Sequence, residues 1–251
     1  MRFYVVKDTE EIGQEAANIF AELIAGKPNC VLGLATGSTP VPLYEQLVMR
    51  SAAGKINFSQ VKTVNLDEYV GLSVDHPQSY RYFMQRHLFD HISINPSNTS
   101  LPDGLSGDLP AMCKEYDAQI VRWGGIDLQL LGIGHNGHIG FNEPGTFFTL
   151  KTHVVNISER TRAANARFFG DDPKSVPSQA VTMGIGNIMG ARSILLLVSG
   201  ASKAEILQRT LHDDVSPEVP ATVLQLHPDV TVIADREAAA CVEEMRQKCY
   251  N

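Results

Sequence analysis

The 251-residue sequence lacks any run of about 18 apolar residues, the length that a membrane-spanning helix needs. Its four cysteines show no C-x-x-C spacing, which argues against a disulfide scaffold and leaves them as reduced thiols. Lysines and arginines are scattered and the formal net charge is −7, so the basic face of a nucleic-acid binder is missing. The apolar stretch near the N-terminus is too short for a signal-peptide core. We therefore expect a cytoplasmic protein that binds neither membrane nor nucleic acid.

What the sequence does contain is the composition of an ordinary globular protein, with 43% hydrophobic and 20% charged residues. No repeat, linker or low-complexity tract divides the chain. Its length suits one α/β domain, so we expect a single domain over residues 1–251.

Strand-like and helical stretches alternate along the chain, which is typical of a wound α/β sheet. Several strand-like runs lack polar alternation, and this indicates burial on both faces. The pattern predicts a single doubly wound, mostly parallel sheet with helices on both faces, a Rossmann-like α/β fold. Ligands in such folds bind beyond the carboxyl ends of the strands. Strands are expected at 2–6, 30–35, 61–66, 126–133, 152–157, 193–199 and 230–234, and helices at 8–26, 40–50, 79–90, 108–122, 158–168, 202–212 and 236–248.

The loop LATGSTP, residues 34–40, leads from a strand into a helix. Gly37, Ser38 and Thr39 would place free backbone amides and two hydroxyls around one point at the helix N-terminus. This predicts an anion cradle. It is not a Walker A loop, because no G-K-[ST] follows, and the residues alone also fit a helix cap without a ligand.

In TVNLDEYVGL, Asp67 and Glu68 directly follow a buried strand. Adjacent residues at a strand end point in opposite directions, so one carboxylate can enter a cleft while the other faces its neighbours or solvent. A carboxylate in a dry cleft can act as a general base. The alternative is a solvated pair that caps a turn.

In LGIGHNGHIGFNEPG, residues 131–145, glycines crowd the end of a strand. Gly132, Gly134 and Gly137 have the G-x-G-x-x-G spacing of a dinucleotide-binding loop. That motif must open a long helix, and Pro144 with its neighbouring glycines interrupts any helix here. A dinucleotide site is therefore not expected.

The same loop presents Asn136, His138 and Glu143 at the predicted ligand edge. His135 and His138 have no cysteine, third histidine or paired acid nearby with ligand spacing, so we expect no metal. Histidine gives and takes protons near neutral pH, since its unperturbed pKa is about 6.5. The loop is interpreted as catalytic, although a structural histidine would give the same pattern.

Two basic residues complete the candidate set. Lys203 in SGASKAEIL lies in the first turn after a strand, where it opposes the helix dipole unless an anion binds nearby. Arg167 in TRAANARFF suits bidentate phosphate recognition or a solvated surface position.

The motifs ATGSTP, VNLDEYVGL, LGIGHNGHIGFNEPG, TRAANARFF and SGASKAEIL occur in this order, and together the chain resembles the glucosamine-6-phosphate deaminases of the glucosamine/galactosamine-6-phosphate isomerase family. The resemblance spans residues 34 to 210, and LQLHPDVTVIAD extends it to the last strand. It implies a Rossmann-like fold and a cofactor-free isomerising deaminase of the hydrolase class. Its substrate would be a sugar phosphate in amino-sugar catabolism, and the chain would act as a monomer or homo-oligomer.

The resemblance also implies a role for each residue. His138 would open the sugar ring with help from Glu143, and Asp67 would move the C2 proton to C1. Gly37, Ser38, Thr39, Arg167 and Lys203 would hold the substrate phosphate.

The chain departs from the family pattern at two places. Asn136 stands where some members carry aspartate, so we expect it to orient His138 by hydrogen bonding, with Glu143 as the main electrostatic partner. Phe147, His153 and Val155 stand where activated members bind the phosphate of N-acetylglucosamine 6-phosphate. We expect little or no activation by that effector, and a weaker case for an allosteric hexamer.

Two rival functions are a 6-phosphogluconolactonase-like hydrolase and a non-enzymatic sugar-phosphate sensor. The paired NLDEY and GFNEP motifs suit proton abstraction better than lactone hydrolysis. A sensor would need an appended helix-turn-helix or basic segment, and the sequence shows neither.

Overall fold

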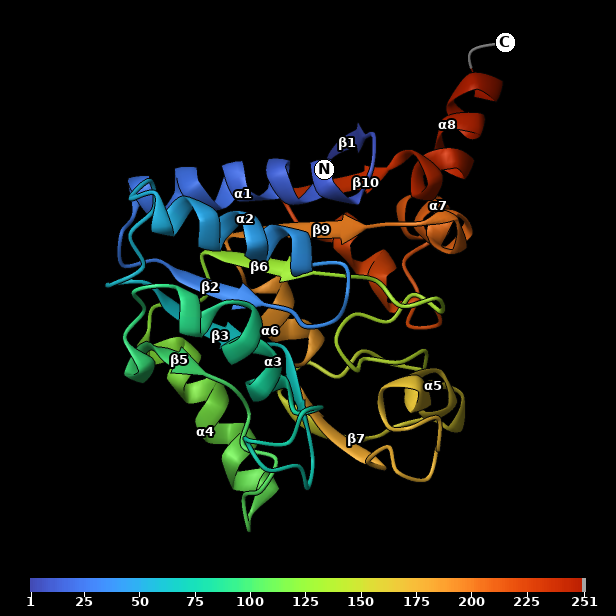
Figure 1. The fold of residues 1–251 in the computed structure, drawn as a ribbon. Helices are drawn as coiled ribbons and strands as arrows, with labels where there is room; N and C mark the ends of the chain where they lie inside the picture. The colour runs from blue at the N-terminus through green and yellow to red at the C-terminus, as the bar shows by residue number, and fades with distance from the viewer. Residues whose placement is uncertain (250–251) are drawn as a thin grey trace.

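The computed structural model describes residues 1–249, apart from the side chains of Arg160, Ala164 and residues 243–249. Its main sheet has seven strands in the order β1-β10-β9-β6-β2-β3-β5, and each pairing is parallel (Figure 1). This confirms the predicted wound, parallel sheet. The strands are β1 Arg2–Val6, β2 Val31–Leu34, β3 Lys62–Asn65, β5 Thr99–Ser100, β6 Leu128–Leu131, β9 Ser193–Val198 and β10 Val230–Asp235.

Helices join the strands and pack around the sheet, with α1 against α2 and α7 against α8. The seven expected helices are all present, with bounds that differ by a few residues, and three of them are extended by a short 3-10 turn. None of the helices within residues 1–249 is long and apolar enough to cross a membrane. The helices are α1 Thr9–Gly26, α2 Val41–Ala52, α3 Tyr80–His87, α4 Leu109–Arg122, α5 Glu159–Asn165, α6 Ile185–Met189, α7 Ala204–His212 and α8 Arg236–Cys249.

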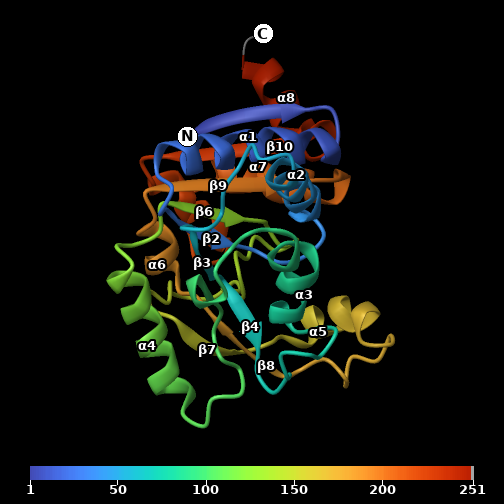
Figure 2. The ribbon, with the colours of Figure 1, turned by 60° about the vertical axis from the view of Figure 1, so that its left-hand side comes forward.

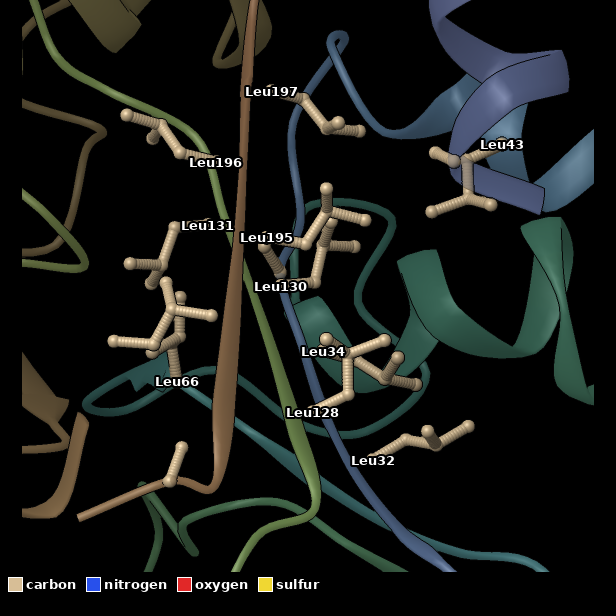
Figure 3. Packing of buried hydrophobic residues seen from close by; sticks show 14 of the residues in the cluster. Leu32, Leu34, Leu43, Leu66, Leu128, Leu130, Leu131, Leu195, Leu196 and Leu197 are labelled. Atoms are coloured by element: carbon tan, nitrogen blue, oxygen red, sulfur yellow. The ribbon is translucent and has the colours of Figure 1, made fainter. Parts of the chain in front are cut away.

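Leucines cover both faces of the sheet, which explains the apolar runs that lack polar alternation. Leu195 and Leu197 of β9 point toward Leu43 of α2, whereas Leu196 points to the opposite side with Leu131 of β6 (Figure 3). All five side chains are at most 1% exposed. Fully burying a leucine contributes about 1.5–3 kcal/mol, so this two-sided core stabilises the sheet whose strand ends carry the site.

A second, three-stranded antiparallel sheet lies beside the first and was not predicted (Figure 2). It consists of β4 Asp67–Tyr69, β8 Gln179–Thr182 and β7 His153–Asn156, with β8 in the middle. The expected strand at 152–157 therefore forms, but it pairs with β8 and not with the main sheet. A separate apolar cluster that includes Tyr69 and Phe141 packs in this part of the molecule.

The side chains of three of the four cysteines are described. Cys30, Cys113 and Cys241 are free, and the side chain of Cys249 lies outside the described residues.

Candidate active site

The segments that the sequence singled out leave the main sheet at one edge. Strands β3, β2, β6 and β9 are consecutive and parallel, so their carboxyl ends lie side by side. The loop with Gly37 follows β2, Asp67 follows β3, the glycine-rich loop follows β6, and Lys203 follows β9. Parallel pairing thus gathers residues that are far apart in the sequence.

The glycine-rich loop folds tightly around His138. The amide of Gly134 donates to the carbonyl of His138 at 2.9 Å, and the amide of Gly137 donates to the carbonyl of Gly134 at 3.0 Å. Gly137 has a φ of +83°, and a Cβ there would lie 2.6 Å from Cγ1 of Val219. A side chain at this position is excluded both by backbone conformation and by space.

Glu143 is the centre of a hydrogen-bonded group with His138 and Asn136. The Nδ2 of Asn136 donates to Oε2 of Glu143 at 2.6 Å, and Oδ1 of Asn136 accepts from the backbone amide of His138 at 3.2 Å. Oε1 of Glu143 lies 3.6 Å from Nδ1 of His138. Asn136 therefore contacts the backbone amide of His138 and the carboxylate of Glu143, and it makes no hydrogen bond to the imidazole ring among the described residues.

The surroundings of His138 favour a neutral imidazole. Burial lowers its pKa, Glu143 opposes this by attracting the charged form, and the neighbouring Lys203 and His135 lower it again. Its Nδ1 is buried and has no hydrogen-bond partner among the described residues. The ring can therefore accept a proton, and Glu143 is placed to stabilise the product.

The two adjacent carboxylates, Asp67 and Glu68, have different partners. Glu68 accepts hydrogen bonds from the backbone amides of Tyr69, Tyr80 and Arg81 at 2.8–2.9 Å, so it anchors the start of α3. The carboxylate of Asp67 makes no hydrogen bond among the described residues, although the residue is only 7% exposed. The two carboxylates therefore have different surroundings, as expected for adjacent residues at a strand end. Asp67 is the one whose carboxylate is free to contact a substrate.

Burial and the neighbouring charge of Glu68 raise the pKa of Asp67 to about 8. A Cβ on Gly140 would lie 3.5 Å from Oδ2 of Asp67 and 2.9 Å from Oγ1 of Thr182. The glycine-rich loop therefore passes directly over the Asp67 carboxylate. A base with a raised pKa is matched to removing a weakly acidic proton near neutral pH.

The basic residues lie at the same edge. Lys203 donates to the carbonyl of Ile133 at 2.8 Å and to Nδ1 of His135 at 3.3 Å, so it reaches across the end of β6. Burial and the charge of Arg167 lower the pKa of Lys203 to about 8. Arg167 itself is exposed, and its guanidinium lies over the ring of Phe168, 4.6 Å from the centroid.

The loop at Gly37, Ser38 and Thr39 is partly to fully exposed. Helix α2 starts just after it, and no side chain caps the helix among the described residues. Gly37 has a φ of +101°, which suits glycine. No hydrogen bond among the described residues joins this loop or Arg167 to Asp67, His138 or Glu143, so the phosphate role of both stays a prediction.

Sequence reasoning missed Thr161, whose hydroxyl donates to Oε1 of Glu143 at 2.6 Å. It also missed Asn165, whose Nδ2 donates to the hydroxyl of Tyr69 at 2.9 Å. Both lie on α5, four residues apart and hence on one face of the helix. The spacing was visible in the sequence, but nothing indicated that this face meets the glycine-rich loop.

A cavity of about 280 Å³ lies beside Glu143 and is lined in part by Phe147, His153 and Val155. Its lining residues, all within the described part of the chain, include no lysine or arginine. The three positions singled out for the effector therefore do form one hollow. Weak or absent activation stays a prediction.

Among the side chains that the structure describes, no three from His, Cys, Asp or Glu are placed to hold a metal ion. The groups that act electrostatically on His138 are Glu143, Lys203 and His135, and the charge of the lysine would repel a cation.

Comparison with known proteins shows which family the chain belongs to. The family model of glucosamine-6-phosphate isomerases/6-phosphogluconolactonase matches residues 7–233. A glucosamine-6-phosphate deaminase of Geobacillus sp. (strain WCH70) is 52% identical over 250 residues, which cover 100% of this chain and 99% of that one. One from Thermoanaerobacter pseudethanolicus is 51% identical over 244 residues, covering 97% of this chain and 96% of that one.

Solved structures extend the comparison. A monomeric glucosamine-6-phosphate deaminase has a TM-score of 0.93 at 49% identity, over 96% of this chain and 100% of that one. A 6-phosphogluconolactonase from Thermotoga maritima has a TM-score of 0.73 at 22% identity, over 93% and 98% of the two chains, and shares the fold. With nearly its whole length matched, this chain belongs to the family of glucosamine-6-phosphate isomerases and 6-phosphogluconolactonases.

Proposed function

We propose that the chain converts glucosamine 6-phosphate and water to fructose 6-phosphate and ammonium. Relatives named glucosamine-6-phosphate deaminase match it at 52% and 51% identity over nearly the full length of both chains, whereas the phosphogluconolactonase from Thermotoga maritima is 22% identical. The deaminase activity is therefore favoured over lactone hydrolysis.

Ring opening comes first and belongs to His138. The neutral imidazole accepts the proton of the anomeric hydroxyl and returns a proton to the ring oxygen, which gives the open-chain aldehyde. Glu143, with Oε1 3.6 Å from Nδ1, stabilises the imidazolium between these two transfers. Such a positioned acid/base contributes about 10²- to 10⁴-fold to the rate.

Isomerisation belongs to Asp67. Its carboxylate removes the proton from C2 while the substrate ammonium group gives up one proton to O1, which yields an enolamine. The proton held by Asp67 then passes to C1, which leaves an iminium at C2. Water adds to C2, and the resulting carbinolamine loses ammonia to give the ketose. Atoms balance, because one water enters and one ammonium leaves.

The substrate phosphate would lie at the N-terminus of α2, against Gly37, Ser38 and Thr39, with Lys203 and Arg167 supplying positive charge. Backbone amides at a helix start and cations are the usual partners of a phosphate dianion. Holding the phosphate fixes C1 and C2 relative to Asp67, and this positioning accounts for part of the rate.

The observation that carries the proposal is the state of Asp67. Its carboxylate is buried, has no hydrogen bond among the described residues and lies under the loop that carries His138, while the adjacent Glu68 accepts from three amides. A structural carboxylate would have partners like those of Glu68.

The test is incubation with glucosamine 6-phosphate in deuterated water, with measurement of ammonia and of deuterium at C1 of fructose 6-phosphate. The wild type should release ammonia and incorporate deuterium, and Asp67→Asn should lose about 10²- to 10⁴-fold of both. Asp214→Asn, at an exposed position, is the matched control. Wild-type turnover of 6-phosphogluconolactone without ammonia release from the amino sugar would refute the proposal.

A further inference from the structure

We propose that Thr161 is a positioning residue that holds the carboxylate of Glu143 against His138. This inference rests on the proposed function. The hydroxyl of Thr161 donates to Oε1 of Glu143 at 2.6 Å, and Oε1 is the same oxygen that lies 3.6 Å from Nδ1 of His138. The helix α5 thereby reaches the acid/base histidine through one intervening carboxylate.

Both oxygens of Glu143 are held, and from different parts of the chain. Asn136 donates to Oε2 from within the glycine-rich loop, and Thr161 donates to Oε1 from α5. Two donors on two oxygens fix the plane of a carboxylate, whereas one donor leaves it free to rotate. The loop alone would therefore not determine which way Oε1 faces.

The direction of the Thr161 hydrogen bond is set by its neighbour at the helix start. The hydroxyl of Ser158 donates to Oγ1 of Thr161 at 3.0 Å, and its oxygen also accepts the backbone amide of Thr161 at 3.2 Å, as an N-cap. The lone pair of Thr161 is thus occupied from Ser158. Its own proton remains for Glu143, which as a carboxylate only accepts.

The same helix face has a second attachment to the site. Asn165, one turn after Thr161, donates to the hydroxyl of Tyr69, which follows Asp67 by two residues. Arg167, a proposed phosphate ligand, comes two residues later. The position of α5 therefore affects both Arg167, at the proposed phosphate site, and the orientation of Glu143.

Removing the hydroxyl while keeping the shape separates positioning from packing. In Thr161→Val, Oε1 loses its donor and the carboxylate turns away from His138, so ring opening slows. The other titratable groups that act on His138, which are Lys203 and His135, both lower its pKa and are unchanged in this variant. A misplaced Glu143 therefore gives a lower pKa for His138.

The experiment compares Thr161→Val with Thr161→Ser, which keeps the hydroxyl and loses the methyl group. We expect Thr161→Val to lower kcat about 10-fold with KM nearly unchanged, as for one hydrogen bond to a charged group. The NMR titration of His138 should move to lower pH in Thr161→Val only, and Thr161→Ser should restore both readouts.

Equal effects of both variants, or a wild-type His138 titration in Thr161→Val, would overturn the inference. The titration needs no turnover, so it decides the role of Thr161 even if the wild type releases no ammonia, the result that would instead overturn the proposed function.

Discussion

The imidazole of His138 occupies the space that a side chain at Gly134 would need. A Cβ on Gly134 would lie 2.2 Å from Cε1 and 2.3 Å from both ring nitrogens of His138. The backbone of Gly134 is not in the left-handed region, so the absence of a side chain serves the histidine and not the chain path.

Gly134→Ala should therefore fold and yet lose activity. The added methyl group displaces His138 from Glu143, and we expect a loss of about 10²- to 10⁴-fold in kcat, as for removal of a general acid/base. Gly132→Ala is the matched control, because a Cβ at Gly132 meets nothing within 4 Å and its φ is not positive. Steady-state kinetics and circular dichroism decide it, and a fully active, folded Gly134→Ala would contradict the placement of His138.

Asp67 should make the protein less stable as pH rises. Its folded-state pKa is about 8 against an ordinary value of 3.8, so between these values the folded state keeps a proton that the unfolded chain releases. Stability is then lost as pH rises through this window. In Asp67→Asn the loss should be smaller by on the order of 4 kcal/mol between pH 5 and 9, since one pKa unit corresponds to about 1.4 kcal/mol.

Urea unfolding at several pH values measures this difference. Asp214→Asn, which changes an exposed carboxylate, should keep the wild-type pH dependence. Parallel curves for the wild type and Asp67→Asn would show that Asp67 is ionised at neutral pH. We expect Asp67→Asn to be inactive and, at alkaline pH, more stable than the wild type, because it removes a buried charge.

Lys203 should govern affinity for the phosphate and its dependence on pH. Because its pKa is lowered to about 8, the free enzyme loses this charge as pH rises past that value, and KM for the sugar phosphate should increase there. Lys203→Gln should raise KM about 10- to 100-fold at pH 7. It should also abolish the increase of KM above about pH 8, which is the alkaline limb of the KM profile. Arg167→Gln should move the limb to higher pH, because the charge of Arg167 lowers the pKa of Lys203.

Competitive inhibition by inorganic phosphate measures the affinity of the phosphate site independently of the catalytic step. The exposed Lys114→Gln on α4 controls for the loss of one positive charge. An unchanged inhibition constant in Lys203→Gln would remove this lysine from the phosphate site.

The main sheet was predictable because its strands are apolar on both faces. Runs such as the one around Leu195 and Leu196 need no tertiary information to indicate a buried parallel strand. The second sheet was not predictable from such runs, because β4 consists of Asp67, Glu68 and Tyr69. Its strand pairing with β8 is long-range, and two adjacent carboxylates disfavour a strand by intrinsic preference.

The candidate site was predictable as far as local chemistry reaches. The clustered glycines indicated a loop that approaches a ligand or a catalytic side chain closely. The alternation of side chains at a strand end predicted that Asp67 and Glu68 point in opposite directions. The contact of Thr161 with Glu143 bridges 18 residues and depends on how α5 packs, which no local pattern records. The resemblance supplied the roles, and the structure supplied the partners.

N-acetylglucosamine 6-phosphate should leave the substrate saturation curve unchanged. The cavity at Phe147, His153 and Val155 has no lysine or arginine in its lining, so a phosphate dianion entering it would lose its hydration without a cation to replace it. The measurement is initial rate against substrate at several effector concentrations. A shift from sigmoidal to hyperbolic kinetics would refute this expectation.

Asn136→Asp should impair activity increasingly as pH rises. Nδ2 of Asn136 donates to Oε2 of Glu143 at 2.6 Å, and aspartate would place a second carboxylate at that distance. Two carboxylates so close do not both ionise, so the variant keeps the hydrogen bond only while one of them holds a proton. As that proton leaves, repulsion turns Glu143 from His138, and the kcat of the variant should fall relative to wild type toward alkaline pH. A ratio of variant to wild-type kcat that stays constant across pH would show that Asn136 does not act through Glu143.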